Sequence, residues 1–200
     1  MKLKELTQED IDGIVAAFTN QSFPNNEKGE FYYFNKEQTK DYIEAYVKGY
    51  FHSGYLYCTE GKEAYCVLRR NRELLKMRDI IYFSIQSIKI LGFSLMHRLS
   101  KIEDSKELPI EEAYALKNIP FIFIGMMVVK EEYQGQGYFR KMLEEVFEMA
   151  RKENRCVILN TDTESKVKKY EHMGFKLVRA RFLEENNYRY DMKWEGGQDM

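Results

Sequence analysis

The sequence predicts an α/β fold, of the α+β type with a mixed sheet, in which helices flank one central sheet. An uncharged apolar run at Phe121–Val129, rich in β-forming residues, is typical of a buried strand. A glycine-containing turn and a helical apolar pattern follow this run directly. Two alternating segments, 175–182 and 188–194, indicate a terminal pair of strands joined by a turn. These elements together favour a sheet covered by helices.

The N-terminal segment predicts an amphipathic helix. Thr7 is a suitable N-cap, and acidic residues follow it in the first turn. Ile11, Ile14, Val15 and Phe18 then recur at the spacing of one helix face.

A second helix and a hairpin are expected next. The helix begins at Thr39 and ends at Gly54. Strands at 55–59 and 63–68 are separated by a short polar turn, which is typical of a hairpin. A weakly marked strand is expected at 2–6, before the first helix.

The segment 79–96 is apolar over a length that suggests a membrane span. Gln86 and Lys89 in its middle argue against a span, and its apolar residues follow a helical stripe. We therefore expect a helix at 80–102 that packs on the core or contributes to a partner interface, such as that of a homodimer. A helix lying on a membrane surface is a further alternative. This helix makes about 70–110 a helical insertion, and a short helix is expected at 111–116.

Composition indicates one domain, 1–200, with 44% hydrophobic and 32% charged residues. A formal net charge of −1 argues against a nucleic-acid partner with its broad basic face. Cys58, Cys66 and Cys156 form no CxxC pair and the three histidines are scattered, so we expect no metal. Reduced thiols, and an N-terminus without an apolar signal run, favour a cytoplasmic protein.

The turn at 133–138, between a strand and a helix, is a candidate anion site. Gly135 and Gly137 allow the backbone to approach a phosphate, and the first free N–H groups of a helix point at it. Neither a Walker loop nor a dinucleotide fingerprint fits, because no Lys-Ser/Thr follows and Arg140 occupies the place of the third glycine. On its own, the pattern is equally typical of a tight structural turn.

A second motif lies downstream, after a short strand at 156–159. It reads Tyr170-Glu-His-Met-Gly-Phe175. Together with Gln134 and Gly137 of the first turn, it resembles the GCN5-related N-acetyltransferase (GNAT) family. The resemblance covers about 121–194 well and the N-terminal half by layout alone. It implies a GNAT-like acyl-CoA N-acyltransferase fold, with a central mixed, mostly antiparallel sheet.

The resemblance implies acetyl-CoA as co-substrate. Backbone N–H groups of the loop 135–140 would bind its pyrophosphate, with help from the Gln134 side chain. The backbone of 127–129 would bind the pantetheine arm and polarise the thioester carbonyl. Arg140 either adds charge at the phosphates or is simply solvated. The expected cofactor-binding residues are Met127, Val128, Val129, Gln134, Gly135, Gln136, Gly137, Tyr138, Phe139, Arg140 and Asn160.

Tyr170 is the catalytic residue that the resemblance implies, as general acid for the departing thiolate; the alternative is a tyrosine packed on the core. His172 lies two positions on, faces away on a helix and is expected at the surface. Asn160 stands where relatives often carry Glu, and it would bind the substrate amine or a water. The general base is then a water relay or another acid, for which Asp162 and Glu164 are weak candidates.

The expected function is transfer of an acetyl group from acetyl-CoA to a primary amine, by direct attack. The acceptor is expected to be a small molecule, with a protein or peptide amine as the variant. Phe139, which replaces the usual small residue, and Asn160 leave open a CoA-binding regulatory protein without turnover. The aromatic segment 31–34 either lines the acceptor site or tucks into the core. An interaction module built on the 80–102 helix is the remaining alternative.

Overall fold

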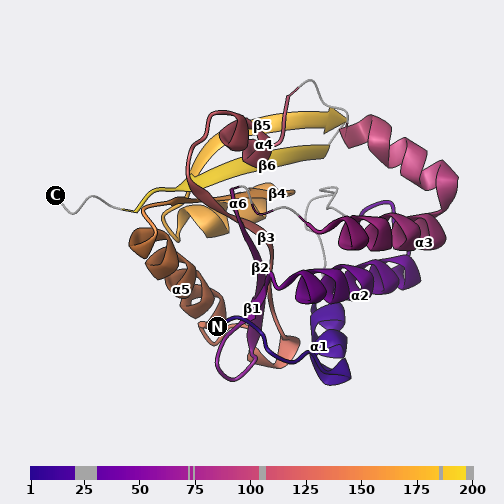
Figure 1. Ribbon diagram of the computed structural model, residues 1–200, viewed down its shortest axis with the longest axis horizontal. Helices are drawn as coiled ribbons and strands as arrows, with labels where there is room; N and C mark the ends of the chain where they lie inside the picture. Colours follow the sequence, from indigo (N-terminus) through magenta and orange to yellow (C-terminus); the bar gives the residue numbers. More distant parts are fainter. Residues whose placement is uncertain (21–30, 72, 74, 104–106, 185–186, 197–200) are drawn as a thin grey trace.

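The computed structural model describes residues 1–20, 31–71, 73, 75–103, 107–184 and 187–196. Its centre is a six-stranded sheet in the order β1-β2-β3-β4-β6-β5 (Figure 1). β3 and β4 are parallel, and every other neighbouring pair is antiparallel. The expected mixed, mostly antiparallel sheet is confirmed. The strands are β1 (Leu56–Cys58), β2 (Ala64–Arg70), β3 (Phe121–Val129), β4 (Cys156–Thr161), β5 (Lys176–Glu184) and β6 (Asn187–Trp194).

Helices α1 (Gln8–Thr19) and α2 (Lys36–Ser53) cover one face of the sheet. Thr7 caps α1 in a full capping box, as the sequence predicts. The predicted start of α2 is wrong, because Asn35 rather than Thr39 is the capping residue. Gly54, in the left-handed region at φ 76°, ends the helix as expected.

The opposite face carries α5 (Tyr138–Lys152) and α6 (Glu164–Glu171). Side chains alternate along β3, so Val128 packs with α1 and α2 while Val129 packs on the α5 side. The short helix α4 (Ile110–Leu116) packs Ile110 beside Phe121 and Ile158. β3 therefore lies between the layer of α1 and α2 and the layer of α5 and α6. Both layers contact the C-terminal end of β3.

The helix α3 (Met77–Glu103) differs from the single straight helix that the sequence suggests. Gly92, at φ 69° and ψ 164°, breaks it into two parts. The first part packs on α2, where Phe83 fills the space that a Cβ at Gly49 would need. The second part leads toward the end of the β5–β6 hairpin (Figure 1).

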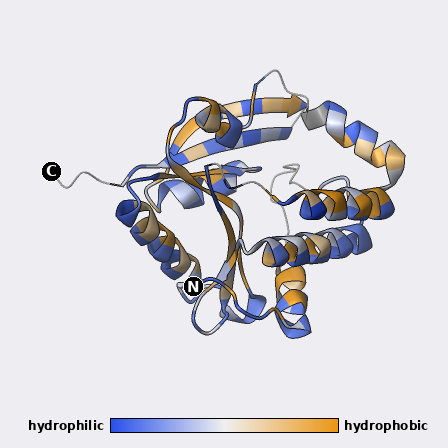
Figure 2. Cartoon of the chain, in the orientation of Figure 1, coloured by the Kyte–Doolittle hydropathy of each residue, from blue (hydrophilic) through white to orange (hydrophobic). Residues whose placement is uncertain are grey.

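Much of the first part of α3 consists of hydrophobic residues, which are orange in Figure 2. Ile81 and Ile85 are about half exposed, whereas Leu91 is buried. By length and composition, 77–101 is long and apolar enough to cross a membrane, although little of it is buried. The break at Gly92 leaves a first part of roughly 22 Å at about 1.5 Å per residue, shorter than a bilayer core of about 30 Å.

One expected strand is not formed. The segment 2–6 makes only an isolated bridge, between Lys2 and Tyr57. Leu3 nevertheless donates its backbone N–H to Leu56 and is buried in the core under α1. The segment therefore lies at the sheet edge without continuing the ladder.

Candidate active site

β3 and β4 separate where the site begins. They pair in parallel over 121–124 and 156–159. Beyond this, β3 continues to Val129 alongside β2 alone, and a register shift makes Gly125 an extra residue, a β-bulge. Backbone groups of 125–129 on this side have no strand partner in the described part of the chain. Apart from the carbonyls of Gly125 and Val129, which accept from the side chains of Tyr46 and Gln134, they are available to a ligand.

A tight turn then carries the chain into α5. Gly135 and Gly137 have φ values of 75° and 87°, which only glycine adopts at little cost. A Cβ on either glycine would meet no atom within 4 Å, so the outer side of the turn is open. Gln134 donates from Nε2 to the carbonyl of Val129 at 3.2 Å, which holds the turn against the end of β3. The short 3-10 helix η2 (Glu131–Tyr133) precedes it.

The N-terminus of α5 opens into the same space. Gly137 is its N-cap and provides no side-chain acceptor. The first intrahelical bond runs from Lys141 N to Gly137 O at 3.0 Å. The N–H groups of Tyr138, Phe139 and Arg140 are therefore without intrahelical partners, and the positive end of the helix dipole lies here. Such an end suits a phosphate.

A cleft of about 560 Å³ lies between this turn, the end of β3 and α6. That volume is typical of a ligand site, for which roughly 300–1,000 Å³ is usual. The Lys169 ammonium lies 4.2 Å from the centroid of the Phe139 ring, and Arg140 supplies a second cation nearby. The cleft is lined by Ala17, Met127, Val128, Val129, Tyr133, Gln134, Gly135, Gly137, Tyr138, Phe139, Arg140, Thr163, Ser165, Lys166, Lys169 and Tyr170.

The Tyr170–Phe175 motif fixes the position of Tyr170 at the end of α6. The carbonyl of Tyr170 accepts from the N–H groups of Met173 and Phe175, at 2.9 and 3.1 Å. Gly174, at φ 89°, turns the chain into β5. The Tyr170 ring packs on Phe175 and Phe139, with centroids 5.4 and 5.6 Å apart. The structure is compatible with both interpretations of Tyr170, as a core-packed residue and as a general acid. One edge of the ring packs on its neighbours, and the other faces the cleft.

The electrostatic setting of Tyr170 keeps its phenol protonated. Burial, and secondarily the charge of Asp162, raise the pKa of Tyr170 well above its usual range. His172 is exposed, and its Nδ1 lies 2.6 Å from the carbonyl of Lys168. It contacts neither cavity described here.

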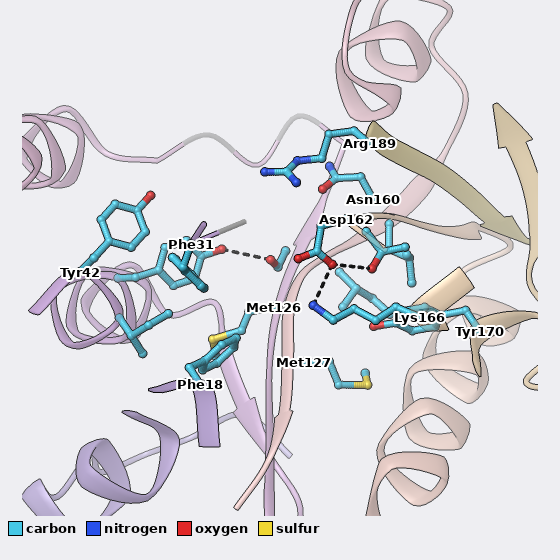
Figure 3. Close-up of a pocket in the computed structure, with 16 residues that line it drawn as sticks. Phe18, Phe31, Tyr42, Met126, Met127, Asn160, Asp162, Lys166, Tyr170 and Arg189 are labelled. Carbon is cyan, nitrogen blue, oxygen red and sulfur yellow. Dashed lines mark hydrogen bonds and ion pairs between the residues drawn. The ribbon is translucent and has the colours of Figure 1, made fainter. Parts of the chain in front are cut away.

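A second, smaller cavity of about 130 Å³ lies on the other side of Tyr170 (Figure 3). Aromatic side chains from α1, the 31–34 segment and α2 form one wall, and polar groups of β4 and β6 form the other. We call it the acceptor pocket. It is lined by Phe18, Phe31, Tyr42, Ile43, Tyr46, Ile124, Gly125, Met126, Met127, Leu159, Asn160, Thr161, Asp162, Lys166, Tyr170 and Arg189.

Asp162 is the only carboxylate among the residues that line the acceptor pocket. It is 6% exposed, and its Oδ1 accepts from Lys166 Nζ at 2.7 Å (Figure 3). Tyr46 donates from its hydroxyl to the carbonyl of Gly125 at 3.3 Å, which ties the aromatic wall to the bulge of β3. Glu164, the other weak candidate for the base, is exposed and lines neither cavity described here.

The two cavities meet, because Met127, Lys166 and Tyr170 line both. A thioester carried along the cleft would therefore end beside Tyr170 and face the acceptor pocket. No group of three or more His, Cys, Asp or Glu residues suited to a metal occurs among the described residues.

The structure gathers nearly all of the residues expected at the cofactor. Asn160 is the main difference, since it lies in the wall of the acceptor pocket rather than in the cleft. Gln136 is exposed and donates from Nε2 to the carbonyl of Glu132 at 2.7 Å. Phe139 both contacts the hydrophobic core and lines the cofactor cleft. Phe31 lines the acceptor pocket, whereas Tyr32 is exposed. Residues 21–30 of the same expected wall lie outside the described residues.

Several site residues were not found from the sequence. Lys166 lies one helical turn before Tyr170, so the i, i+4 spacing on α6 carried a usable signal. Lys169 had no such signal, since charged residues on a short helix are usually solvated. Tyr42, Tyr46 and Arg189 come from α2 and β6, and only the tertiary fold brings them to one cavity.

Comparison with known proteins agrees with this geometry. Residues 89–177 match a family model described as an acetyltransferase (GNAT) domain. Among curated proteins, none matches this sequence. Three crystal structures cover nearly the whole chain and share its fold.

The first is PH1933 from Pyrococcus horikoshii OT3, with 15% identity, 98% and 97% of the two chains covered and a TM-score of 0.56. The second, from Corynebacterium glutamicum ATCC 13032, is described as histone acetyltransferase HPA2 and related acetyltransferase. It has 11% identity, coverage of 98% and 96% and a TM-score of 0.55. The third is an N-acetyltransferase from Staphylococcus aureus Mu50, with 17% identity, coverage of 92% and 95% and a TM-score of 0.52.

At these identities the structural matches establish the fold, and the family model identifies the central motifs within it. The chain therefore contains a region that matches the GNAT acetyltransferase domain, within a GNAT-like fold, and the GNAT family uses acetyl-CoA.

Proposed function

We propose that the protein transfers the acetyl group of acetyl-CoA to the primary amine of a small molecule. The observation that carries the proposal is the meeting of the cofactor cleft and the acceptor pocket at Tyr170. Two substrates held on either side of one side chain need no covalent enzyme intermediate, so the amine attacks the thioester directly. The acceptor pocket, at about 130 Å³, is well below the roughly 300 Å³ of ordinary ligand sites, which favours a small acceptor.

In this proposal the loop 135–140 and the N-terminus of α5 hold the pyrophosphate. The free backbone edge of 127–129 holds the pantetheine arm and donates to the thioester oxygen as charge develops on it. The amine loses a proton to Asp162, directly or through a water, and forms the new C–N bond. The C–S bond breaks, and Tyr170 gives its proton to the departing CoA thiolate.

Phe139 does not support a binding protein without turnover. Its ring packs against Tyr170 and leaves the neighbouring cleft at about 560 Å³. The volume beside it is therefore adequate for a cofactor arm.

The test begins with acetyl-CoA binding by calorimetry, followed by release of free thiol from acetyl-CoA with a panel of small amines. Binding and amine-dependent thiol release are expected. Binding without thiol release for any small amine or amine-bearing peptide would replace the enzyme with a CoA-binding regulatory protein. Turnover with peptides alone would move the acceptor to the peptide class.

We also propose that α3 pairs with the α3 of a second copy of the chain. Its outward face carries apolar side chains at helical spacing, among them Ile81 and Ile85, and large exposed apolar patches mark interaction sites. Light scattering should show a dimer in the wild type and a monomer in Ile81→Asp. Gln8→Asp, at an exposed position of α1 outside this face, is the control for charge alone. A monomeric wild type at all concentrations would refute the pairing.

A further inference from the structure

An arginine in the acceptor pocket has an unsatisfied donor. Arg189 lies on β6, and its Nη1 is shielded from solvent without a hydrogen-bond partner among the described residues. Shielded donors in native proteins are nearly always paired, because an unpaired one costs the desolvation of its N–H group. A guanidinium is the most demanding donor of all, since its charge persists at every working pH.

The other arginines of the same hairpin show how this sheet normally satisfies a guanidinium. Arg179 and Arg181 both donate to Asp191, at 2.7 and 3.1 Å. Arg189 is the direct cross-strand neighbour of Arg181, yet Asp191 serves only the other two among the described pairs. The sheet thus provides a carboxylate for two arginines and turns the third toward the pocket.

Because Arg189 lines the acceptor pocket, a ligand in this pocket could supply the hydrogen-bond acceptor for its Nη1. Figure 3 shows Arg189 above Asn160, with Asp162, Lys166 and Tyr170 at the other end of the same wall. A ligand with its anionic group at Arg189 and Asn160 would direct its other end toward the groups that carry out the transfer. The facing wall of Phe18, Phe31, Tyr42 and Tyr46 is aromatic, so the rest of the ligand is apolar.

We propose that the acceptor is an amine that also carries an anionic oxygen group, carboxylate or phosphate, which Arg189 binds. Arg189 is then a specificity-determining residue, and amino acids with an apolar body are the simplest members of the substrate class. A planar guanidinium matches both groups with two parallel hydrogen bonds. This inference rests on the proposed acetyl transfer to a small amine.

The first arm of the test compares acceptors that differ only at the anionic group. Phenylalanine, phenylalaninamide and phenethylamine share the amine and the ring, and O-phosphoethanolamine against ethanolamine tests the phosphate. We expect kcat/KM to be roughly ten- to hundredfold higher for an anionic acceptor than for its neutral partner, the usual range for a charge-assisted contact.

Arg189→Gln should remove this preference mainly by raising KM for the anionic acceptors, and Arg189→Lys should restore part of it. Lys176→Gln removes an exposed charge from the same hairpin and is the matched control. Because Arg189 Nη1 has no partner to lose, the melting temperature of Arg189→Gln should stay close to that of the wild type.

The second arm needs no turnover. Phenylacetate and phenyl phosphate, each against benzyl alcohol, are titrated by calorimetry into the wild type and Arg189→Gln. Anion binding that requires Arg189, with no amine acetylated, would refute the proposed transferase and leave the anion site standing. Acetylation without preference for anionic acceptors, or anion binding unchanged in Arg189→Gln, would overturn the role of Arg189.

Discussion

Replacing Tyr170 with phenylalanine removes the phenolic hydroxyl, and with it the proposed acidic proton, while the aromatic ring stays in place. The ring contacts of Tyr170 with Phe139 and Phe175 depend on the ring and survive the change. The carbonyl of residue 170 still accepts from Met173 and Phe175. The free energy of unfolding should therefore change by less than about 1 kcal/mol, as for a substitution that makes no cavity.

The effect on catalysis should be much larger. A positioned general acid contributes roughly 10²- to 10⁴-fold, which is about 2.7–5.4 kcal/mol at 1.36 kcal/mol for each factor of ten. Tyr170→Phe should lower kcat by this factor and leave the dissociation constant of acetyl-CoA within about threefold. Tyr114→Phe, in α4 and away from both cavities, is the control.

The pH profile gives an independent check. Burial and then Asp162 raise the pKa of Tyr170, so the phenol keeps its proton throughout pH 7 to 10. Loss of the acid by ionisation should therefore not lower kcat of the wild type in this range. Thiol release measured by a dye reaction gives kcat, and calorimetry gives the affinity. Wild-type kcat in the mutant, or an alkaline decline in the wild type that the mutant lacks, would refute the acid role of Tyr170.

Three further predictions use the same assays. Asp162→Asn should lower kcat about 10²-fold as a lost general base, and an unchanged kcat would leave a water relay as the base. Gly137→Asp should weaken acetyl-CoA binding at least tenfold more than Gly137→Asn. Both residues tolerate the left-handed backbone at φ 87°, so only the added charge near the phosphates separates them; equal affinities would contradict the loop's role. Asp10→Asn should remove stability that depends on pH. Burial alone would raise the pKa of Asp10, but hydrogen bonds from Lys62, Tyr65 and Thr7 lower it to about 2, from 3.8. The ionised form is thus stabilised by about 2 kcal/mol, present above pH 4 and lost as the pH falls toward 2. The free energy of unfolding can be measured by urea unfolding, followed by the fluorescence of Trp194, the single tryptophan. The difference between the wild type and Asp10→Asn should shrink by this amount between pH 4 and pH 2, and a difference that does not change with pH would contradict the prediction.

The parts of the fold that the sequence predicts well are those that local rules determine. The β3 strand is a nine-residue apolar run, and its bounds were predicted correctly because charge and turn residues delimit it. Gly54 and Gly174 end their elements where a left-handed residue is required. The start of α2 was misplaced because Asn35 and Thr39 are both good caps. Asn35 is the one used, and it forms a capping box with Gln38.

The kink of α3 shows a limit of periodicity. The apolar stripe continues through Gly92, so the pattern alone predicts one helix. A single glycine costs about 1 kcal/mol within a helix, which tertiary contacts readily overcome in either direction. Here the second part of α3 leads to Glu107, and Arg179 of β5 contacts that residue at 3.2 Å. The bend at Gly92 allows one helix to contact both α2 and β5.

The cofactor half and the acceptor half of the site also differ in how well the sequence predicts them. The cofactor half is contiguous in the sequence, since the end of β3, the turn and the first residues of α5 follow one another. A phosphate needs backbone N–H groups and glycines in order, and this requirement can be read directly from 127–140. The acceptor half has no such order. Its aromatic wall, its carboxylate and Arg189 come from α1, α2, the end of β4 and β6, and they meet only because β3 and β4 separate. A site built on that separation can change its acceptor by replacing a single side chain on any of four elements, while the turn that binds the cofactor stays as it is.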